Sequence, residues 1–373
     1  MGSNTFIDLF AGCGGASLGF KQAGFVLKAA VELDPITCRS YADNHPEAAL
    51  LINDIKLLSA QDILDKAGLD VGQCTVVLGC PPCQGFSRHR LKDSGFGDPR
   101  NPLVTVFAEM VISMLPAFFV FENVPGILKI RKSPWHASKE RLTASGYNIV
   151  EGVVDAADYG VPQRRRRFTA IGCRLPAVIV DIPPKTHSDP REGGVLPSWR
   201  TVRDAIGDLP PLGNGEQGGN DPLHCASTHS QATLNRFRYI PHDGGSRSSL
   251  PHEMQLDCHK RHSGHLDVYG RLWWDKVANT VTGGCTRPSK GRFLHPDQDR
   301  GITLREAARL QGFPDDYRFE GNKQQIALQI GNAVPPPLAL AIALSLKIAL
   351  IDGAYSANGA SNLYTSALSS PSL

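Results

Sequence analysis

The chain has 373 residues, of which 41% are hydrophobic and 20% charged, and its formal net charge is +3. These values are typical of a globular protein with a large core, and the net charge is too small to indicate a polyanionic partner by itself. The nine cysteines show no pairing pattern, and the N-terminal residues lack the basic and apolar regions of a secretory signal. We therefore expect free thiols in a reducing compartment, the cytoplasm.

In the first half of the chain, apolar runs of strand length alternate with segments of helix length. We expect strands at residues 5–10, 26–32, 49–54, 75–80, 117–124, 148–155 and 167–173. Helices fit between them at residues 15–23, 35–44, 58–67, 102–115 and 136–145. Near-continuous apolar strands separated by helices predict an α/β fold with a doubly wound, mostly parallel sheet. In such folds ligands bind at the carboxyl ends of the strands.

The composition changes near Pro183. From there to Arg300 the chain is rich in Gly, Pro, His and Arg, and nine of its twelve histidines lie in this stretch. The weak apolar periodicity predicts a second, smaller and irregular domain at residues 185–299. The larger domain would then consist of residues 1–184 and a return segment at residues 300–352.

Regular pattern resumes in the last part of the chain. Thr303, followed three residues later by Glu306, predicts a capped helix start, and a last helix is expected from about Pro337. The apolar run 338–351 contains two polar residues and is too short to cross a bilayer, which favours a buried helix. Residues 353–373 are rich in Ser and Ala and carry no charge, so we expect a disordered tail.

A glycine-rich segment, FAGCGG at residues 10–15, follows the first strand and opens a helix. A dinucleotide fingerprint would have Gly where Ser17 stands, which argues against NAD. Glu32 ends the second strand and suits a ribose diol, while Asp54 ends the third and could accept from an adenine amino group. Either carboxylate alone could be a solvated strand end or a helix cap. At three successive strand ends, however, these features favour a nucleoside-containing cofactor.

The segment VLGCPPCQGFS at residues 77–87 has two cysteines, Cys80 and Cys83, with the spacing of a zinc site. The two prolines between them argue against both a zinc clip and a redox pair. Zinc would also need ligands from a distant segment with loose spacing, which offers Cys258, His259, His262 and His265. Cys80 is better interpreted as a small buried residue, and Cys83 as a thiol on a loop forced by the prolines. Such a thiol can ionise beside basic groups and act as a nucleophile.

Two further motifs are expected at the same end of the sheet. Glu122 ends the fifth strand after an apolar run, so partial burial should raise its pKa and suit it to an acid role; the alternative is a structural hydrogen bond. The run QRRRR at residues 163–167 opens the last strand. Such a run is usually a solvated face, but alternation along a strand would direct two of the four arginines into the site.

Taken in order, these motifs strongly resemble those of the DNA (cytosine-5)-methyltransferase family. The resemblance covers roughly residues 5–175 and 268–350. Its motifs are FAGCGG (10–15), VELD (31–34), ND (53–54), GCPPCQGFS (79–87), ENV (122–124), QRRRR (163–167), REAARLQGFP (305–314) and GNAVPP (331–336). The stretch DVYGRLWWDKVANTVTGG (267–284) also looks like that family. Eight motifs in sequence are far more specific than any one of them.

The resemblance implies a fold of the S-adenosylmethionine-dependent methyltransferase type and a reaction. The methyl group of S-adenosyl-L-methionine would go to C5 of a flipped-out cytosine in double-stranded DNA, after the Cys83 thiolate has attacked C6. Glu122 would protonate or hydrogen-bond N3 and the exocyclic amine. Arg165, chosen by its register from Gln163, would hold O2, and Arg167 would support it.

The resemblance also assigns binding residues and no metal. The implied cofactor contacts are Phe10, Gly12, Gly14, Glu32, Asp54, Pro82 and Asn332. The implied DNA contacts are Gln84, Ser87, Arg88, Arg90 and Thr280. Further basic candidates for DNA contact, or for a solvated surface, are Lys92, Arg100, Lys260, Arg261, Arg271, Arg287, Lys290 and Arg292. Because Asn332 lies near the far end of the chain, the last helix must return beside the first strand.

Two other functions are weighed against this one. An RNA cytosine-5 methyltransferase of the related tRNA branch would rely on single-stranded loops, whereas a separate His- and Arg-rich domain favours duplex DNA. A non-catalytic relative would lack the nucleophile or the glutamate, and this chain has both. We expect a monomeric bacterial cytoplasmic enzyme that does not contact membranes. A cognate restriction endonuclease would recognise the same DNA site but would not bind the methyltransferase itself.

Overall fold

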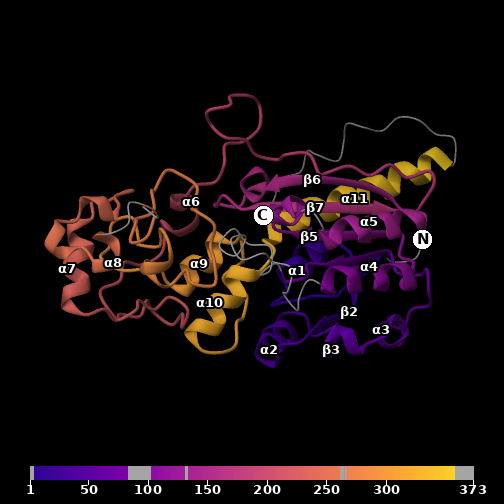
Figure 1. Cartoon of the computed structure of the whole chain (residues 1–373), viewed down its shortest axis with the longest axis horizontal. Coiled ribbons are helices and arrows are strands. Elements are labelled where there is room, and N and C mark those ends of the chain that lie inside the picture. The colour runs from indigo at the N-terminus through magenta and orange to yellow at the C-terminus, as the bar shows by residue number, and fades with distance from the viewer. Residues whose placement is uncertain (1–3, 83–101, 131–132, 261–263, 265–266, 358–373) are drawn as a thin grey trace.

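The computed structural model describes residues 4–82, 102–130, 133–260, 264 and 267–357. Its centre is a seven-stranded sheet with the strand order β3-β2-β1-β4-β5-β7-β6 (Figure 1). The strands are β1 (Thr5–Asp8), β2 (Val26–Glu32), β3 (Ala49–Ile52), β4 (Val76–Gly79), β5 (Phe118–Asn123), β6 (Asn148–Asp155) and β7 (Arg166–Cys173). All seven strands expected from the sequence are confirmed, each within two residues at either end.

The sheet is mostly parallel, as expected, with one strand reversed. Strands β1 to β5 pair in parallel, while β7 is antiparallel to both β5 and β6. The reversal places the start of β7 opposite the ends of its neighbours, with Phe168 beside Asn123 and Arg166 beside Asp155. The arginine run therefore reaches the same edge of the sheet as the carboxyl ends of the parallel strands.

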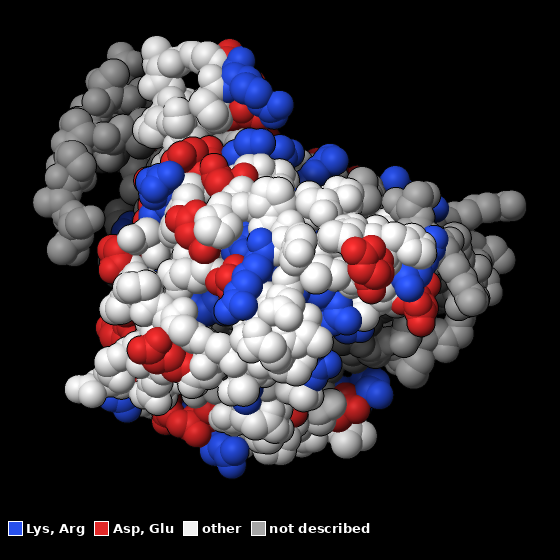
Figure 2. All heavy atoms as spheres, turned by 90° about the vertical axis from the view of Figure 1, so that its left-hand side faces the viewer, with Lys and Arg blue, Asp and Glu red and all other residues white. Residues whose placement is uncertain are grey.

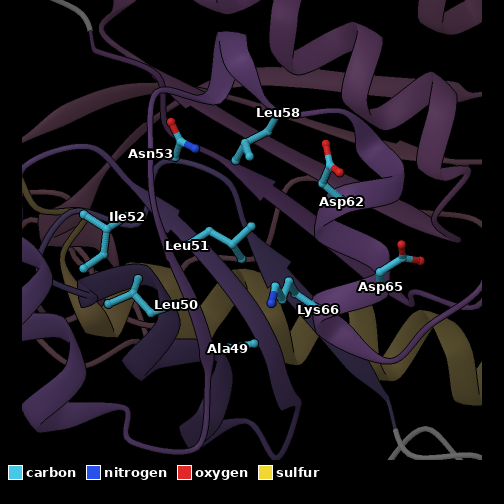
Figure 3. Close-up of a pocket in the computed structure, with 9 residues that line it drawn as sticks. All are labelled: Ala49, Leu50, Leu51, Ile52, Asn53, Leu58, Asp62, Asp65 and Lys66. Carbon is cyan, nitrogen blue, oxygen red and sulfur yellow. The ribbon is translucent and has the colours of Figure 1, made fainter.

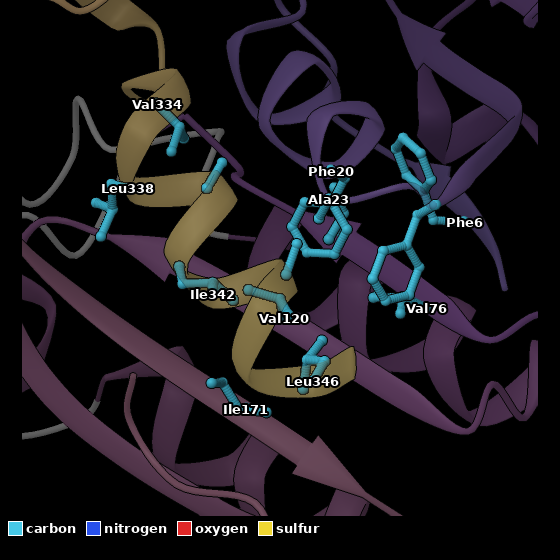
Figure 4. Close-up of a cluster of buried hydrophobic side chains, with 14 of the residues drawn as sticks. Phe6, Phe20, Ala23, Val76, Val120, Ile171, Val334, Leu338, Ile342 and Leu346 are labelled. Carbon is cyan, nitrogen blue, oxygen red and sulfur yellow. The ribbon is translucent and has the colours of Figure 1, made fainter. Parts of the chain in front are cut away.

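Helices cover both faces of the sheet (Figure 1). They are α1 (Gly15–Gln22), α2 (Pro35–Asn44), α3 (Ala60–Ala67), α4 (Pro102–Met114), α5 (Pro134–Ala144) and α11 (Pro336–Ala357). On one face, Phe20 of α1 and Leu338 of α11 pack with Phe6 of β1 in a single buried cluster (Figure 4). On the other face, Phe107 of α4 and Trp135 of α5 belong to a second cluster. The doubly wound arrangement expected from the sequence is thus confirmed.

The last helix returns beside the first strand, as the sequence required. A Cβ atom added at Gly19 of α1 would lie 2.5 Å from the carbonyl oxygen of Pro336, and one added at Gly15 would lie 2.3 Å from that of Val334. Only glycine allows α1 and α11 to approach this closely. One helical stretch of the described chain, Lys323–Gly353, is long and apolar enough to cross a membrane by length and composition. Half of its apolar window is buried inside the fold, as in a core helix.

The region after the sheet has short helices joined by turns and lies at the other end of the molecule (Figure 1). Its elements include α6 (Val202–Ile206), α7 (Gln231–Tyr239), α8 (Asp257–Lys260), α9 (Leu304–Leu310) and α10 (Lys323–Asn332). The expected capping box of Thr303 and Glu306 opens α9. The sequence pattern did not reveal α10, and the domain boundaries inferred from composition remain a prediction.

Two of the basic candidates for DNA contact are structural instead. Arg271 is fully buried and donates to the carbonyl oxygens of Phe237 and Ile240. Arg292 is also buried, and its guanidinium lies 4.1 Å from the ring centroid of Trp273. An arginine in an irregular segment can bind loop carbonyls instead of phosphates, because both present oxygen acceptors.

The close approach of α1 and α11 yields a first prediction. Gly19→Ala should lower the free energy of unfolding by about 1–3 kcal/mol, because the added methyl overlaps the backbone of α11. That decrease is the net effect, because the steric cost should exceed the stabilisation of about 1 kcal/mol that alanine brings to a helix interior relative to glycine. Urea unfolding measures the difference. Gly264→Ala is the control, since its Cβ would meet nothing within 4 Å. Equal stability of the two variants would contradict the packing argument.

Candidate active site

The glycine-rich loop between β1 and α1 has one open side and one packed side. Gly12 and Gly14 adopt left-handed conformations, with φ of 53° and 93°. A Cβ atom at Gly12 would meet nothing within 4 Å, whereas one at Gly14 would lie 2.3 Å from Nε2 of His45. Gly12 thus leaves space that a ligand can approach, and Gly14 allows the loop to rest on the protein beneath it.

Glu32 binds this loop and retains a free acceptor position. Its Oε2 accepts from the backbone N–H of Gly12 at 2.8 Å, and its Oε1 accepts from those of Leu33 and Asp34 at 2.9 and 3.0 Å. A carboxylate has about four acceptor positions, so one remains on Oε2. That position can take a ribose hydroxyl, which is the role expected for Glu32.

The other expected cofactor contacts lie around the same edge. Asp54 follows β3 and caps the short 3-10 helix Ile55–Leu57, and the backbone N–H of Lys56 lowers the pKa of its carboxyl group. Phe10 is partly buried against the sheet, while Pro82 and Asn332 are exposed. Since β3, β2 and β1 are neighbours, the open glycine and two carboxylates face one region. These residues fit a nucleoside cofactor.

A buried histidine supports the glycine loop. Nε2 of His45 lies 3.2 Å from the carbonyl oxygen of Gly14 and 3.1 Å from the hydroxyl of Tyr317. Its Nδ1 lies 3.2 Å from Nζ of Lys21, which can only donate, so we assign the tautomer with hydrogen on Nε2. Burial, and then the charge of Lys21, lower the pKa of His45 to about 4.

Glu122, which is expected to act on the base, lies at the sheet edge beside Arg167, the arginine expected only to support Arg165. Glu122 is 8% exposed, and its Oε1 lies 2.8 Å from Nε of Arg167. Burial raises the pKa of Glu122, although Arg167 and Arg165 oppose the shift. A carboxyl group in this environment can hold a proton more firmly than an exposed one, as an acid role requires.

The cysteine loop begins beside this pair. Burial raises the pKa of Cys80 well above its usual value, and the charge of Glu122 raises it further. Cys80 therefore stays protonated and is a poor nucleophile. The side-chain amide of Asn123 donates to the carbonyl oxygen of Pro81 at 3.2 Å and so ties the loop to β5. Several expected contacts lie outside the described residues, namely Cys83, Gln84, Ser87, Arg88 and Arg90.

The arginine run alternates in burial, as expected for a strand start. Arg164 and Arg166 are exposed, whereas Arg165 is 2% exposed. The guanidinium of Arg165 donates to backbone carbonyl oxygens of two segments that are distant in sequence, whereas Arg167 contacts Glu122. The hydroxyl of Thr280, an expected DNA contact, donates to the carbonyl oxygen of Arg164 at 2.7 Å.

Three supporting residues were not identified from the sequence. Asp155 accepts from Nε of Arg164 at 2.6 Å and from the backbone N–H of Arg165 at 2.9 Å. Gln163 is fully buried, donates to the carbonyl oxygen of Leu310 at 2.8 Å and accepts from the N–H of Val281. Asn123 is the third. Asp155 and Asn123 each end a strand, and this position was the available signal for both. The partners of Gln163 are too distant in sequence.

A separate hollow of about 720 Å³ lies along the outer edge of the sheet (Figure 3). Strand β3 supplies Leu50, Leu51 and Ile52, and α3 contributes Asp62 and Lys66. The residues that line the hollow include neither Gly12 nor the buried Glu122–Arg167 pair. Among the residues that the structure describes, no group of three or more His, Cys, Asp or Glu side chains is placed to hold a metal ion.

Comparison with known proteins gives a consistent result. A family model described as C-5 cytosine-specific DNA methylase matches residues 4–347. Type II methylase M.HgiDII of Herpetosiphon aurantiacus is 36% identical over 91% of this chain and 94% of that protein. Type II methyltransferase M1.HphI of Haemophilus parahaemolyticus is 37% identical over 91% and 86%. The crystal structure of a DNA modification methyltransferase from an E. coli prophage is 28% identical, with a TM-score of 0.72 over 94% of this chain and all of that one.

The histidine beneath the glycine loop yields a prediction of pH dependence. His45 titrates near 6.5 when unfolded and at about 4 when folded, so the unfolded chain takes up the proton first as the pH falls. The stability that neutral His45 contributes is complete above about pH 6.5 and is lost towards pH 4. Between pH 7 and pH 5, His45→Gln should remove about 2 kcal/mol of this dependence.

Thermal unfolding at several pH values measures this effect. The comparison with wild type separates the effect of His45 from that of other groups. Asp8, for example, has a raised pKa of about 6, so its protonation increases the stability of the folded state as the pH falls. His136→Gln, at an exposed position of α5, is the matched control and should keep the wild-type dependence. The assignment fails if His45→Gln and wild type lose stability equally on acidification.

Proposed function

Because the chain belongs to the C-5 cytosine-specific DNA methylase family, we propose that it methylates a cytosine flipped out of double-stranded DNA, through a covalent bond between Cys83 and C6 of the base. The chain is a DNA (cytosine-5-)-methyltransferase. Its family implies S-adenosylmethionine as methyl donor and DNA as substrate. The observation that carries the mechanism is the buried Glu122–Arg167 pair at the carboxyl edge, beside the start of the cysteine loop.

The chemistry explains why these residue types are needed. C5 of cytosine is a weak nucleophile, and attack of the Cys83 thiolate on C6 would place negative charge at C5. S-adenosylmethionine supplies an electrophilic methyl group for that carbon. Loss of the C5 proton and of the thiol then restores the aromatic ring. Covalent catalysis of this kind divides one difficult step into two easier ones.

Glu122 and Arg167 would stabilise the activated base. A protonated Glu122 can donate to N3, and the neighbouring guanidinium can donate to O2. The sequence register gave the O2 contact to Arg165 with Arg167 in support. The contacts of the two side chains favour the reverse division, because Arg167 pairs with Glu122 while Arg165 binds backbone carbonyls.

The cofactor would lie at the edge formed by β1, β2 and β3. The open side of Gly12 and the remaining acceptor position of Glu32 support this placement, with Asp54 at the next strand end. Phe10, Gly14, Pro82 and Asn332 would complete the contacts. We propose the region 185–299 for DNA contact.

The surface at the far end of this region carries both signs of charge (Figure 2). Local groups, rather than a uniform field, would therefore contact phosphates there. Exposed Arg287 and Lys290 are candidates, together with Thr280 and with Gln84, Ser87, Arg88 and Arg90, which lie outside the described residues. Extruding the base costs roughly a few kcal/mol, which contacts in the pocket must offset. We further propose a monomeric cytoplasmic enzyme of the bacterial restriction–modification kind that does not contact membranes.

The nucleophile yields a prediction. Cys83→Ser should abolish methylation of DNA, because a hydroxyl is far less ionised than a thiol at neutral pH. An oligonucleotide containing 5-fluorocytosine should trap a covalent adduct with wild type and none with the variant. Cys80→Ser is the matched control and should keep the adduct. Full activity of Cys83→Ser would exclude the proposed nucleophile. Offering tRNA in parallel distinguishes the DNA from the RNA reaction.

The buried carboxylate yields another. Glu122→Gln should lower kcat by about 10²–10⁴-fold, because an amide cannot transfer a proton to N3. DNA affinity, measured by fluorescence anisotropy, should change little, since the contact strengthens only as the base is activated. Arg141→Gln, at an exposed arginine of α5 that pairs with Glu109, is the control. A glutamine variant with wild-type kcat would remove Glu122 from the reaction.

A further inference from the structure

Arg165 is more firmly anchored than its neighbours in the arginine run. One guanidinium nitrogen donates to the carbonyl oxygen of Val281 at 3.0 Å. The other donates to those of Gly331 at 3.0 Å and Ala333 at 2.9 Å. All three acceptors are main-chain atoms, so these contacts fix the path of the backbone whatever side chains it carries.

Two of the acceptors lie on either side of Asn332. Gly331 is in the last turn of α10, and Ala333 is its C-cap residue. Carbonyl groups at a helix C-terminus lack partners within the helix and carry partial negative charge, so a buried guanidinium is well suited to them. The side-chain amide of Gln311 also donates to the carbonyl of Ile330 in this turn. Arg165 and Gln311 therefore fix the backbone on both sides of Asn332, and with it the direction in which this exposed side chain leaves the helix end.

The backbone of Arg165 is held equally well. Its N–H donates to Asp155 at 2.9 Å, and the same carboxylate accepts from Arg164 at 2.6 Å. Two residues further along, on the same side of the strand, Arg167 pairs with Glu122. One short strand segment thus joins the turn that bears Asn332 to the carboxylate proposed to act on the base.

We infer that Arg165 is a positioning residue, which fixes Asn332 against the cofactor and couples the cofactor end of the site to the Glu122–Arg167 pair. The inference rests on the proposed function, which assigns Asn332 to the cofactor. It gives Arg165 a role that requires no contact with the base. Loss of the guanidinium would then weaken cofactor binding even when DNA is absent, whereas loss of a base contact would not.

Calorimetric titration with S-adenosylhomocysteine, without DNA, tests this inference. Arg165→Lys should weaken binding about tenfold, because the compact ammonium group lacks the guanidinium fork whose two nitrogens reach carbonyls of two separate segments. The exposed control Arg166→Lys should bind within about twofold of wild type. Circular dichroism and thermal unfolding check that each variant is folded. Wild-type affinity in folded Arg165→Lys would overturn the inference.

A double-mutant cycle sharpens the test. If Arg165 acts through Asn332, the combination of Arg165→Lys with Asn332→Ala should lose little more than Asn332→Ala alone. Losses that multiply would overturn the coupling. Asp155→Asn is a milder second variant should Arg165→Lys not fold; it should weaken binding about threefold, and unchanged affinity would count against the inference. If wild type itself binds no S-adenosylhomocysteine, the proposed cofactor site fails, which is a different result.

Discussion

The reversed direction of β7 is the constraint on which the site depends. Six strands, β1 to β6, run in the same direction and present their carboxyl ends at one edge, where a ligand site in an α/β fold normally forms. A seventh strand in that direction would begin at the opposite edge and take its first residues away from the site. Because β7 runs antiparallel, the side chains before and at its start lie beside the end of β5 instead. Chain direction, more than any single contact, brings Arg167 to Glu122.

Placing so many charges at a buried edge has a cost that the local structure offsets. Burial alone would strongly favour neutral Glu122, and the two arginines favour the ionised form. The balance leaves its pKa raised, so the carboxyl group holds a proton more firmly than an exposed glutamate does. The buried charge of Arg165 is compensated differently, by hydrogen bonds to main-chain carbonyls. Each such hydrogen bond to a charged group contributes about 1.5–3 kcal/mol to stability. The two solutions suit different roles, since only the first leaves a proton able to move.

The sequence was sufficient where the information is local. Apolar runs located every strand of the sheet, and side-chain alternation predicted that the four arginines would divide between two sides, as buried Arg165 and exposed Arg164 and Arg166 do. It could not divide the roles of Arg165 and Arg167, because the acceptors of Arg165 lie more than 100 residues away along the chain. Partners outside the local sequence also hid the buried role of Arg271, whose acceptors Phe237 and Ile240 are 34 and 31 residues away, and the support that Gln163 gives, whose acceptor is 147 residues away. An arginine in a sequence shows its charge but not whether its partner is a phosphate, a carboxylate or a carbonyl.

A common feature recurs around the proposed cofactor contacts. At three places a charged or polar side chain binds main-chain atoms of a ligand-facing segment: Glu32 the N–H of Gly12, His45 the carbonyl of Gly14, and Arg165 the carbonyls around Asn332. Backbone held in this way keeps its path when the side chains facing the ligand change. Groups that must respond to the reaction, such as Glu122, can then be few, because the surrounding backbone is already in position before the base arrives. In a site supported in this way, substitution of residues that touch no ligand can lower affinity or rate. Such residues are recognised from the main-chain atoms that they bind rather than from the chemistry of the reaction.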